Sequence, residues 1–541
     1  MKKYLSPLIL AGIVITLGIG AWWLGGRPVA KVNELTISRT MDQILAEAQP
    51  MREVALADGE TYDLSIQPVM KEIDGRKVRM LAYNGSIPGP TLHVSEGSRV
   101  TVRLKNDGDR ATTLHAHGVR MDNAFDGVPD MTQKEIAPGE TFTYELKFPD
   151  AGVFWYHPHV RTDYALESGL YGNIIVTSQE TAYWGKANRE VPLMIDDIAL
   201  DQQGLLPFDD KRSDHTLMGR FGNVMLINGV SDFNLSVKQG EVVRLYLTDA
   251  ANTRLFNVAI PKAKMKLVGA DIGRYTKEQF IDEVLLAPGE RRVVDTLFTE
   301  PGTYTIEHRT PGKLYTLGTV TVTKEKAAPD YALEYSKLRT NESVVQEIES
   351  VMAKHLARSP DKSLRLTLDM NTAMQGMMNS QGGHMGGGHM TADGSMMSGA
   401  GMGMGDDGDS LEWEDTMAMM NRSSTSETVK WKLVDMATGK ANMDISDWSF
   451  KRGEEVKIRI FNDPMSMHPM QHPIHFHGQR FIILATNGER NPNPVWMDTA
   501  LVPKGDTVDI LLEASNPGNW MVHCHILEHA ESGMMFGFKV E

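Results

Sequence analysis

Cysteine is almost absent from this chain: of 541 residues, only Cys524 carries a thiol. The chain therefore cannot form an intrachain disulfide, and no cysteine stands near the N-terminus to take a lipid anchor. Basic residues are also fewer than acidic ones, 55 against 70, which gives a formal net charge of −15. This balance argues against nucleic acid as a partner and favours solubility.

One long apolar run stands at the N-terminus. Lys2 and Lys3 precede an apolar stretch from Tyr4 to about Gly25. Roughly 20 such residues span a bilayer, whereas the core of a signal peptide has about 7–15. No small-x-small cleavage site follows at once, and there is no twin-arginine pair. We therefore expect residues 1–27 to be an uncleaved membrane-anchor helix, with a cleaved signal as the alternative. Either would place the body of the chain in the periplasm or elsewhere outside the cytoplasm, and an anchor would hold it at the inner membrane.

The single cysteine belongs to a string of copper-type ligands. Cys524 is followed after five residues by His529 and after five more by Met534. A thiolate, an imidazole and a weak axial thioether are three of the four ligands of a blue-copper centre. Neighbours in an extended strand point to opposite faces, so His523 and His525 would face away from the sulfur. The spacing predicts an electron-transfer copper connected through a few bonds to metals behind it.

Other histidines occur in pairs separated by one residue. If the stretch from His472 to His477 is extended, His472 lies on one face and the pair His475 and His477 lies on the other. His472 can therefore complete the blue-copper set. Three further pairs have the same spacing, which makes four in total: His523 with His525, His115 with His117, and His157 with His159. A lone pair is more often a zinc site or a surface feature, but four pairs are the donor set for three coppers that share oxygen.

A glycine interval repeats three times along the chain. It is the same in Gly139–Gly152, Gly289–Gly302 and Gly505–Gly518. Between the glycines, apolar and polar residues alternate as in a half-buried strand. Where the first and third copies place histidine pairs, the middle copy has Glu307-His308-Arg309. The pattern predicts three related β domains, the middle one without metal, and a copper cluster at the interface of the first and third.

Short strands, frequent Pro-Gly turns and few helical periods favour an all-β fold of Greek-key sandwiches. We expect the first domain at residues 50–180, the second at 190–325 and the third at 361–541. Residues 341–357 are the best candidate for a helix, in the connection between the second and third domains. Residues 370–420 are predicted to be an insertion in the third domain.

Methionine is concentrated in that insertion, which contains thirteen of the chain's 34 methionines among glycine and serine. This composition cannot bury a core and predicts a mobile loop. Thioether sulfur is a soft donor that prefers Cu(I), so the segment suggests capture of that ion. A low-complexity insertion without a metal role is the alternative. Met370, and Met467 and Met470 just before His472, are candidate substrate residues, with simple loop packing as their alternative.

Four motifs together resemble the signatures of the three-domain multicopper oxidases over roughly residues 50–541. They are HAHG at 115–118, HPH at 157–159, HPIHFHG at 472–478 and HCHILEHAESGM at 523–534. The resemblance implies three cupredoxin-like domains and four copper ions: one of type 1, one of type 2 and a type 3 pair. By position it assigns to type 1 His472, Cys524, His529 and Met534. It assigns to type 2 His115 and His475, and to the type 3 pair His117, His157, His159, His477, His523 and His525.

The resemblance also implies an activity, in which four one-electron substrate oxidations at type 1 are coupled to reduction of O₂ to water at the trinuclear cluster. The methionine-rich insertion is similar to that of the bacterial periplasmic cuprous oxidases used in copper tolerance, so we expect Cu(I) as the substrate. A laccase-like phenol oxidase, a ferroxidase and a non-catalytic copper store are the alternatives. We expect a monomer.

The chain departs from the family pattern at two positions. Cuprous oxidases carry an acidic residue four places before the first type 1 histidine, where this chain has His468. The family glutamate that relays protons is replaced by Ala530, and Glu531 or Glu528 is a candidate substitute. Asp126 stands where the family has its oxygen-site aspartate, with a turn residue as the alternative interpretation. Asp126 and Glu531 are therefore the expected catalytic acids.

Overall fold

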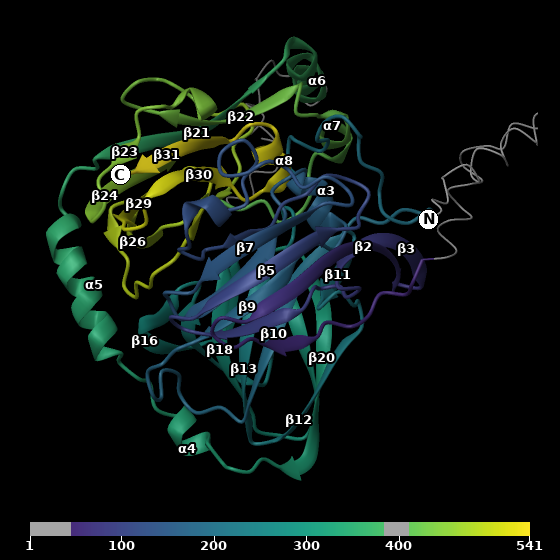
Figure 1. The fold of residues 1–541 in the computed structure, drawn as a ribbon, viewed down its shortest axis with the longest axis vertical. Helices are drawn as coiled ribbons and strands as arrows, with labels where there is room; N and C mark the ends of the chain where they lie inside the picture. The colour runs from purple at the N-terminus through teal and green to yellow at the C-terminus, as the bar shows by residue number, and fades with distance from the viewer. Residues whose placement is uncertain (1–44, 384–409) are drawn as a thin grey trace, which may run out of the picture. The chain divides into compact units, whose positions relative to one another are not determined.

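The computed structural model describes residues 45–383 and 410–541, and strands dominate these ranges (Figure 1). The all-β prediction is therefore confirmed. The predicted membrane anchor at residues 1–27 and the centre of the methionine-rich insertion, residues 384–409, lie outside the described residues. Within the described ranges, none of the helices is both long enough and apolar enough to span a membrane.

The strands fall into three modules, each with two sheets. The first module comprises β1 (Glu53–Ala55), β2 (Thr61–Ile73), β3 (Arg76–Tyr83), β4 (Thr91–Ser95), β5 (Arg99–Asn106), β6 (His115–His117), β7 (Thr141–Lys147), β8 (Gly152–His157) and β9 (Gly172–Thr177). Its sheets have the orders β3-β2-β5-β7 and β1-β4-β9-β8-β6. A 3₁₀ helix, η1 (Asn123–Phe125), and a short helix, α3 (Thr162–Glu167), lie in its loops.

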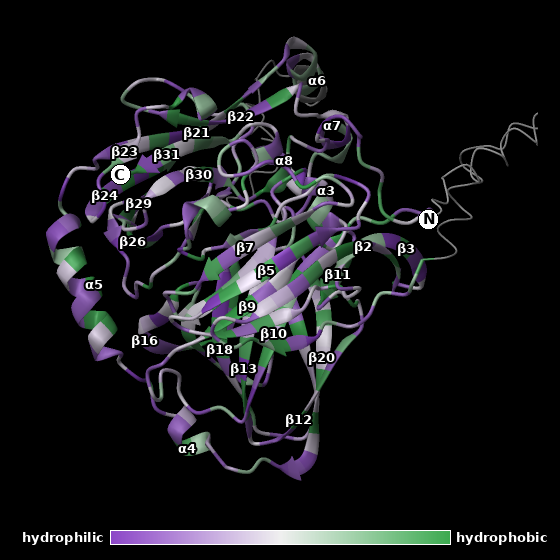
Figure 2. Cartoon of the chain, in the orientation of Figure 1, coloured by the Kyte–Doolittle hydropathy of each residue, from purple (hydrophilic) through white to green (hydrophobic). Residues whose placement is uncertain are grey.

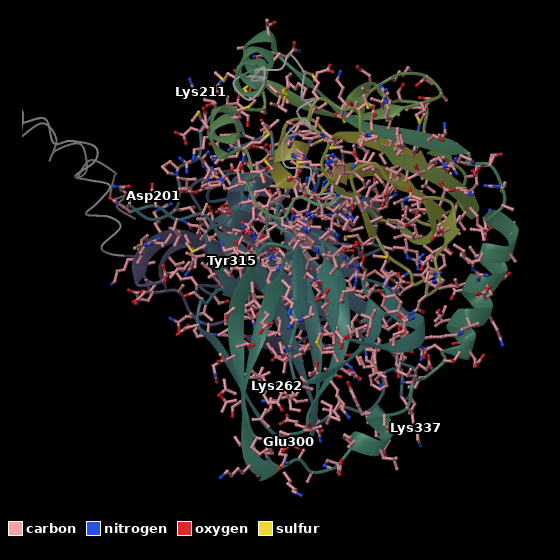
Figure 3. The ribbon with its side chains drawn as sticks, turned by 180° about the vertical axis from the view of Figure 1, so that it is seen from behind. Asp201, Lys211, Lys262, Glu300, Tyr315 and Lys337 are labelled. Atoms are coloured by element: carbon pink, nitrogen blue, oxygen red, sulfur yellow. The ribbon has the colours of Figure 1, made fainter. Side chains whose placement is uncertain are left out.

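The second module repeats this plan. It comprises β10 (Arg189–Ile198), β11 (Val224–Ile227), β12 (Phe233–Gln239), β13 (Glu241–Asp249), β14 (Phe256–Ala259), β15 (Lys264–Ala270), β16 (Gly273–Ile281), β17 (Glu283–Leu286), β18 (Arg291–Phe298), β19 (Gly302–Arg309) and β20 (Leu314–Lys326). The sheet orders are β11-β10-β13-β18-β15-β16 and β12-β20-β19-β14-β17. Exposed charged residues, among them Lys262, Glu300 and Lys337, lie in loops at one end of this module (Figure 3).

The third module contains the remaining strands and most of the remaining helices. It comprises β21 (Lys362–Met370), α6 (Thr372–Gly383), α7 (Ala418–Ser423), β22 (Val429–Asp435), η2 (Asn442–Asp444), β23 (Ser449–Phe450), β24 (Glu454–Asn462), β25 (His472–Phe476), β26 (Arg480–Thr486), β27 (Glu489–Arg490), β28 (Thr499–Val502), β29 (Thr507–Ala514), β30 (Gly518–Cys524), α8 (Leu527–Glu531) and β31 (Met535–Val540). The sheet orders are β22-β21-β24-β29-β26-β27 and β23-β31-β30-β25-β28.

All three modules share one strand order. In one sheet of each module, the last strand of the module pairs in parallel with an earlier strand. On its other side the last strand pairs antiparallel with the strand before it, which in turn pairs antiparallel with a fourth strand. The resulting orders are β4-β9-β8-β6, β12-β20-β19-β14 and β23-β31-β30-β25. The second glycine of the repeated interval is the first residue of β8, β19 and β30 in turn, with φ of +156°, +142° and +146°. These φ values favour glycine, which explains why this residue type recurs at all three positions.

The middle module has different residues where the other two pair imidazoles. His115 pairs with His157 in the first module, and His475 pairs with His523 in the third. The glycine interval puts Glu307 at the corresponding place on β19, and its partner on β14 is Ala259. A glutamate opposite an alanine cannot supply the two imidazoles that the other modules present at this level of the sheet.

Two helical segments bear on the sequence predictions. The helix predicted at 341–357 is confirmed as α5 (Glu342–His355), which buries Ile348 and Met352 in an apolar cluster that also includes Leu484. A short helix, α4 (Ala332–Tyr335), precedes it. Apolar residues otherwise gather in the strands, and α5 is mostly hydrophilic (Figure 2). The prediction of a mobile loop at 370–420 is wrong at both ends, where α6 and α7 form because Met374 and Met420 bury their side chains in the third module's core.

The two glycines that begin β19 and β30 permit a matched test of the contact between the first and third modules. A β-carbon on Gly302 would meet no atom within 4 Å, whereas one on Gly518 would lie 2.5 Å from the Asn123 β-carbon. Gly302→Ala should cost about 1–3 kcal/mol from backbone strain alone. Gly518→Ala should cost more, because it adds a steric clash with the first module. Thermal unfolding midpoints measure both variants, and equal losses would contradict the added cost.

Candidate copper centres

Histidines from the first and third modules meet at a shared buried surface. β6 carries His115 and His117, and β25 carries His475 and leads into His477. The rings of His117 and His475 stack with centroids 3.7 Å apart, and those of His115 and His477 stack at 4.0 Å. The two strands are more than 350 residues apart in sequence, so the cluster exists only because the modules dock.

The remaining predicted cluster residues complete this group. The last residues of β8 and β30 and those that follow them bring four more rings within 6 Å of the imidazoles of β6 and β25; these are His157, His159, His523 and His525. Three triplets bring their ligand atoms within 4.8 Å of one another: His115–His117–His157, His115–His475–His477 and His159–His477–His523. The ring of His525 lies 5.1 Å from that of His117. The structure therefore brings together all eight histidines that the sequence assigned to the trinuclear cluster.

Hydrogen bonds set which nitrogen of each ring is free. Nδ1 donates to a backbone carbonyl at 2.8–2.9 Å in four rings, which are those of His115, His157, His475 and His523. This fixes the tautomer and directs Nε2 into the cluster. His117 is reversed: its Nε2 donates to the Asp498 carboxylate at 2.9 Å, and its Nδ1 has no partner among the described residues.

Unpartnered buried nitrogens are the strongest indication that this site suits metal. Nε2 of His115, His157, His159 and His475 has no hydrogen-bond partner among the described residues. Buried polar atoms are normally paired, because leaving one unpaired costs free energy. Burial also lowers the pKa of seven imidazoles, that of His523 to about 3, so these rings are neutral and able to bind a metal ion; they belong to His117, His157, His159, His475, His477, His523 and His525. The donor set therefore fits copper.

Two buried aspartates hold the ligand rings from behind. The Asp126 carboxylate accepts a hydrogen bond from His477 Nδ1 at 3.0 Å and lies 3.2 Å from His115 Nδ1. Burial alone would raise the pKa of Asp126, but the two imidazoles outweigh burial and hold it well below the ordinary range. Asp126 is thus a carboxylate placed to orient two rings. Sequence reasoning missed Asp498, which precedes β28 without any motif; only its position beside the histidine strand β25 could have indicated it.

The predicted type 1 residues form a second group behind the first. Cys524 Sγ lies 3.5 Å from His472 Nδ1 and 3.9 Å from His529 Nδ1, and the two nitrogens are 3.3 Å apart. Met534 is fully buried in the same apolar cluster, and its carbonyl accepts the Cys524 N–H at 3.1 Å. Trp431 stacks on His529 with ring centroids 4.2 Å apart. The cysteine and the two histidines assigned to type 1 therefore meet in one buried site, and Met534 adjoins it through its backbone carbonyl.

The candidate substrate methionines differ in how far their side chains are exposed to solvent. Met370 and Met470 are 5% and 0% exposed and belong to the apolar core of the third module. Met467 is 40% exposed, and Met465, in the same loop before β25, is 88% exposed. Only the latter two thioethers are accessible from solvent without opening the core. His468, in the same loop, is buried, and its Nε2 has no partner among the described residues.

The two candidate glutamates have different surroundings. A cavity of about 330 Å³ is lined by His159, His523 and Glu531, so Glu531 shares a space with two cluster ligands. Glu528 instead accepts hydrogen bonds from Asn252 and Thr253 of the second module, at 2.9 and 3.1 Å. Withdrawal from water, with the nearby Asp163 carboxylate, raises the pKa of Glu531 to about 8. The carboxyl group therefore retains its proton at neutral pH.

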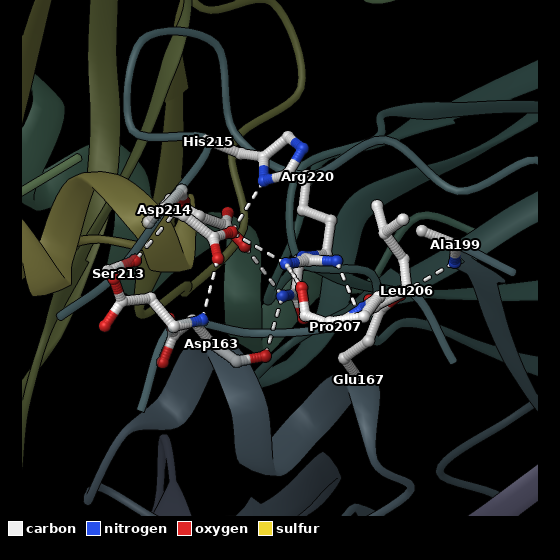
Figure 4. Close-up of polar contacts among 12 residues, drawn as sticks. Asp163, Glu167, Ala199, Leu206, Pro207, Ser213, Asp214, His215 and Arg220 are labelled. Atoms are coloured by element: carbon white, nitrogen blue, oxygen red, sulfur yellow. Dashed lines mark hydrogen bonds and ion pairs between the residues drawn. The ribbon is translucent and has the colours of Figure 1, made fainter. Parts of the chain in front are cut away.

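A polar scaffold around α3 supports Glu531. The Thr162 N–H, at the start of α3, donates to the Glu531 carboxyl at 2.9 Å. Figure 4 shows Asp163 and Glu167 of this helix near the buried guanidinium of Arg220, which donates to Asp214 at 2.7 Å and to two loop carbonyls. The N-terminus of α3 is thus joined to Glu531, which lines the cavity, by the Thr162 N–H.

Comparisons with known proteins agree with this geometry. Residues 65–181, 190–332 and 413–541 each match a family model described as multicopper oxidase. Copper resistance protein A of Escherichia coli is 26% identical, with 100% of this chain and 99% of that protein covered. Multicopper oxidase mco of Staphylococcus aureus is 25% identical, with 89% and 88% covered. The solved multicopper oxidase of Campylobacter jejuni, titled a metallo-oxidase, shares the fold with a TM-score of 0.67 at 24% identity, with 92% and 95% covered.

Replacement of the single cysteine tests the type 1 assignment. Cys524→Ser should abolish the intense blue absorption of the copper-loaded protein, because that band requires a thiolate–copper bond. Oxygen uptake with any reducing substrate should be lost with it. Met534→Leu is the matched control, since it removes only a weak axial ligand and should leave the protein blue. Visible spectroscopy with copper analysis measures both, and a blue Cys524→Ser protein would refute the assignment.

Proposed function

This chain belongs to the multicopper oxidase family, and on that premise we propose that it oxidises Cu(I) outside the cytoplasm as part of copper tolerance. As a multicopper oxidase it is an oxidoreductase with four copper ions, O₂ and a reducing substrate. When bound, the coppers supply the redox chemistry that joins substrate oxidation to reduction of O₂ to water. The observation that carries the proposed ligand assignment is the set of buried imidazole nitrogens without partners, next to the buried Cys524.

We assign His472, Cys524, His529 and Met534 to type 1, and the eight clustered histidines to types 2 and 3. The alternation of β30 supports this division: His523 and its partner His475 face the cluster, while Cys524 faces the type 1 group. With copper bound, the peptide links that join Cys524 to His523 and His525 would provide a covalent route for electrons between the two groups. His115 and His475 form the type 2 pair in this assignment.

The exposed methionines next to His472 carry the assignment of Cu(I) as substrate. Met465 and Met467 present soft thioether donors at the surface of the loop that leads into β25, whose first residue is His472. Soft sulfur prefers Cu(I) to the harder Fe(II). Relatives named copper resistance protein A point the same way. The sequence of residues 384–409 contains further methionines that could supply thioether donors. Membrane attachment through residues 1–27 stays a prediction, and so does a monomeric state.

The test of this substrate is a double variant in that loop. Met465→Leu with Met467→Leu should lower kcat/KM for Cu(I) about tenfold, which corresponds to ~1.4 kcal/mol of lost Cu(I) affinity. Oxidation of a phenol by the same preparation should be unaffected. Met436→Leu with Met443→Leu is the matched control, since those methionines are 55% and 59% exposed elsewhere on the third module.

Steady-state oxygen uptake with Cu(I), Fe(II) and a phenol, measured on one preparation, gives the comparison. Equal losses for Cu(I) and phenol would count against Cu(I) capture by this loop. A wild-type protein that turns over the phenol faster than Cu(I) would favour the laccase-like alternative.

Reduction of O₂ to water consumes one proton for each electron, and we assign that supply to Glu531. Its protonated carboxyl group shares a cavity with His159 and His523. Asp126 is less suited to donate, because two imidazoles already hold it as a carboxylate. Its part is to orient His115 and His477, so of the two expected catalytic acids only Glu531 retains a proton-transfer role.

Glu531→Gln should slow reoxidation of the fully reduced enzyme by O₂ about 100-fold, the usual size of a lost general acid. Anaerobic reduction of type 1 by substrate should keep its wild-type rate. Glu528→Gln is the control, since Glu528 does not line the cavity. Stopped-flow absorbance follows both half-reactions, and an unchanged reoxidation rate in Glu531→Gln would remove this residue from the proton path.

A further inference from the structure

The second module supplies none of the assigned copper ligands, yet one of its side chains reaches the back of the cluster. We infer that Arg291, the first residue of β18, is a positioning residue that sets the geometry of the trinuclear centre by holding Asp498 against two ligand rings. The inference rests on the proposed function in one respect: the rings that it positions are taken to be copper ligands.

Arg291 connects all three modules from a fully buried position. Its guanidinium makes a two-pronged contact with the Asp498 carboxylate of the third module, at 2.7 Å from Nη1 and 2.5 Å from Nη2. Its Nε donates to the Val153 carbonyl of the first module at 2.8 Å. Its backbone N–H donates to Asp271 of its own module at 2.8 Å. Such planar, bidentate recognition of a carboxylate is specific to arginine.

Asp498, held in place by Arg291, forms hydrogen bonds with two ligand rings from different modules. Its carboxylate accepts the His117 Nε2–H at 2.9 Å, and its backbone carbonyl accepts the His475 Nδ1–H at 2.9 Å. The Thr499 hydroxyl donates to the same carboxylate at 2.9 Å. A carboxylate only accepts hydrogen bonds, so His117 must donate through Nε2, and its Nδ1 is left to face the cluster. Arg291 thus keeps in place the group that makes His117 differ from the other rings.

Glycines make this close approach possible. A β-carbon on Gly118, which follows His117, would lie 2.2 Å from an Asp498 carboxylate oxygen and 2.9 Å from Arg291 Nη2. A β-carbon on Gly289, in the turn before β18, would lie 2.8 Å from the ring of His525. The second module is therefore in direct contact with a third ligand ring as well, and no side chain could be inserted at either place without moving the cluster.

The same module contains a matched ion pair that has no connection to the cluster. Arg244 contacts Asp295 through two prongs at 2.8 and 3.0 Å, and both side chains are almost fully buried. The pair joins β13 to β18, the same strand that begins with Arg291. Among the described residues, Arg244 forms hydrogen bonds with Asp295, Glu190 and Gly185 and with no assigned copper ligand. The pair therefore separates the general effect of losing a buried arginine from an effect on the cluster.

The experiment compares Arg291→Lys with Arg244→Lys in the copper-loaded full chain. Lysine retains the charge but cannot make the two-pronged contact. Arg291→Lys should keep the blue type 1 band, because all its ligands belong to the third module. It should alter the type 2 electron paramagnetic resonance signal and weaken copper binding at the cluster by about 10–100-fold, the usual effect of losing a partner of a metal ligand. Arg244→Lys should keep the type 2 signal and the copper affinity of the wild type.

An unchanged type 2 signal and copper affinity in Arg291→Lys would overturn the inference, and so would equal losses in the two variants. If Arg291→Lys does not fold, as shown by loss of the blue band, Asp498→Asn decides: an altered type 2 signal with the blue band intact supports the inference, and an intact signal refutes it. Failure of the proposed function is distinguishable, because wild-type protein would then lack the type 2 signal or oxygen uptake.

Discussion

The docking of the first module onto the third is the contact on which the rest of the site depends. It buries imidazoles face to face, with His117 on His475 and His115 on His477. Burying so many ring nitrogens without hydrogen-bond partners is unfavourable by itself. In most rings, neighbouring groups form a hydrogen bond with only one of the two nitrogens. Bound copper would satisfy the others, so metal binding and module docking stabilise each other. The buried aspartates, the backbone carbonyls and the close glycine contacts all act on this one surface.

The residues in the sites could be predicted because strand geometry is simple. Side chains alternate along β25 and β30, so the sequence alone places His472 with Cys524, and His475 with His523. The equal glycine intervals likewise indicated that each module has a strand that begins at the second glycine of its interval. Asp498 and Arg291 could not be found in this way, since neither belongs to a local pattern and the two residues that contact each other are 207 positions apart. The choice between Glu528 and Glu531 also depended on docking, because Asn252 of the second module occupies Glu528. Met370 and Met470 are buried because they pack in the apolar core of the third module, which the composition of the methionine-rich segment does not predict.

The middle module shows how one fold can take two kinds of role. On β19 and β14, Glu307 and Ala259 stand where the other modules pair imidazoles. The turn that precedes β18 nevertheless keeps its glycine, and that turn lies against the ring of His525. The middle module therefore has the same strand order as the two modules that supply the copper ligands, while it contacts the cluster through the turn before β18.

The glycine interval that ends in β30 has a consequence for how such a chain can evolve. Lengthening or shortening it by one residue would turn the strand over, so that the thiolate would face the imidazole cluster and a histidine would take its place beside Met534. No intermediate arrangement would work. Over this stretch residues can change as long as buried positions stay apolar, but the length cannot change, so descendants should preserve the number of residues more strictly than their identities.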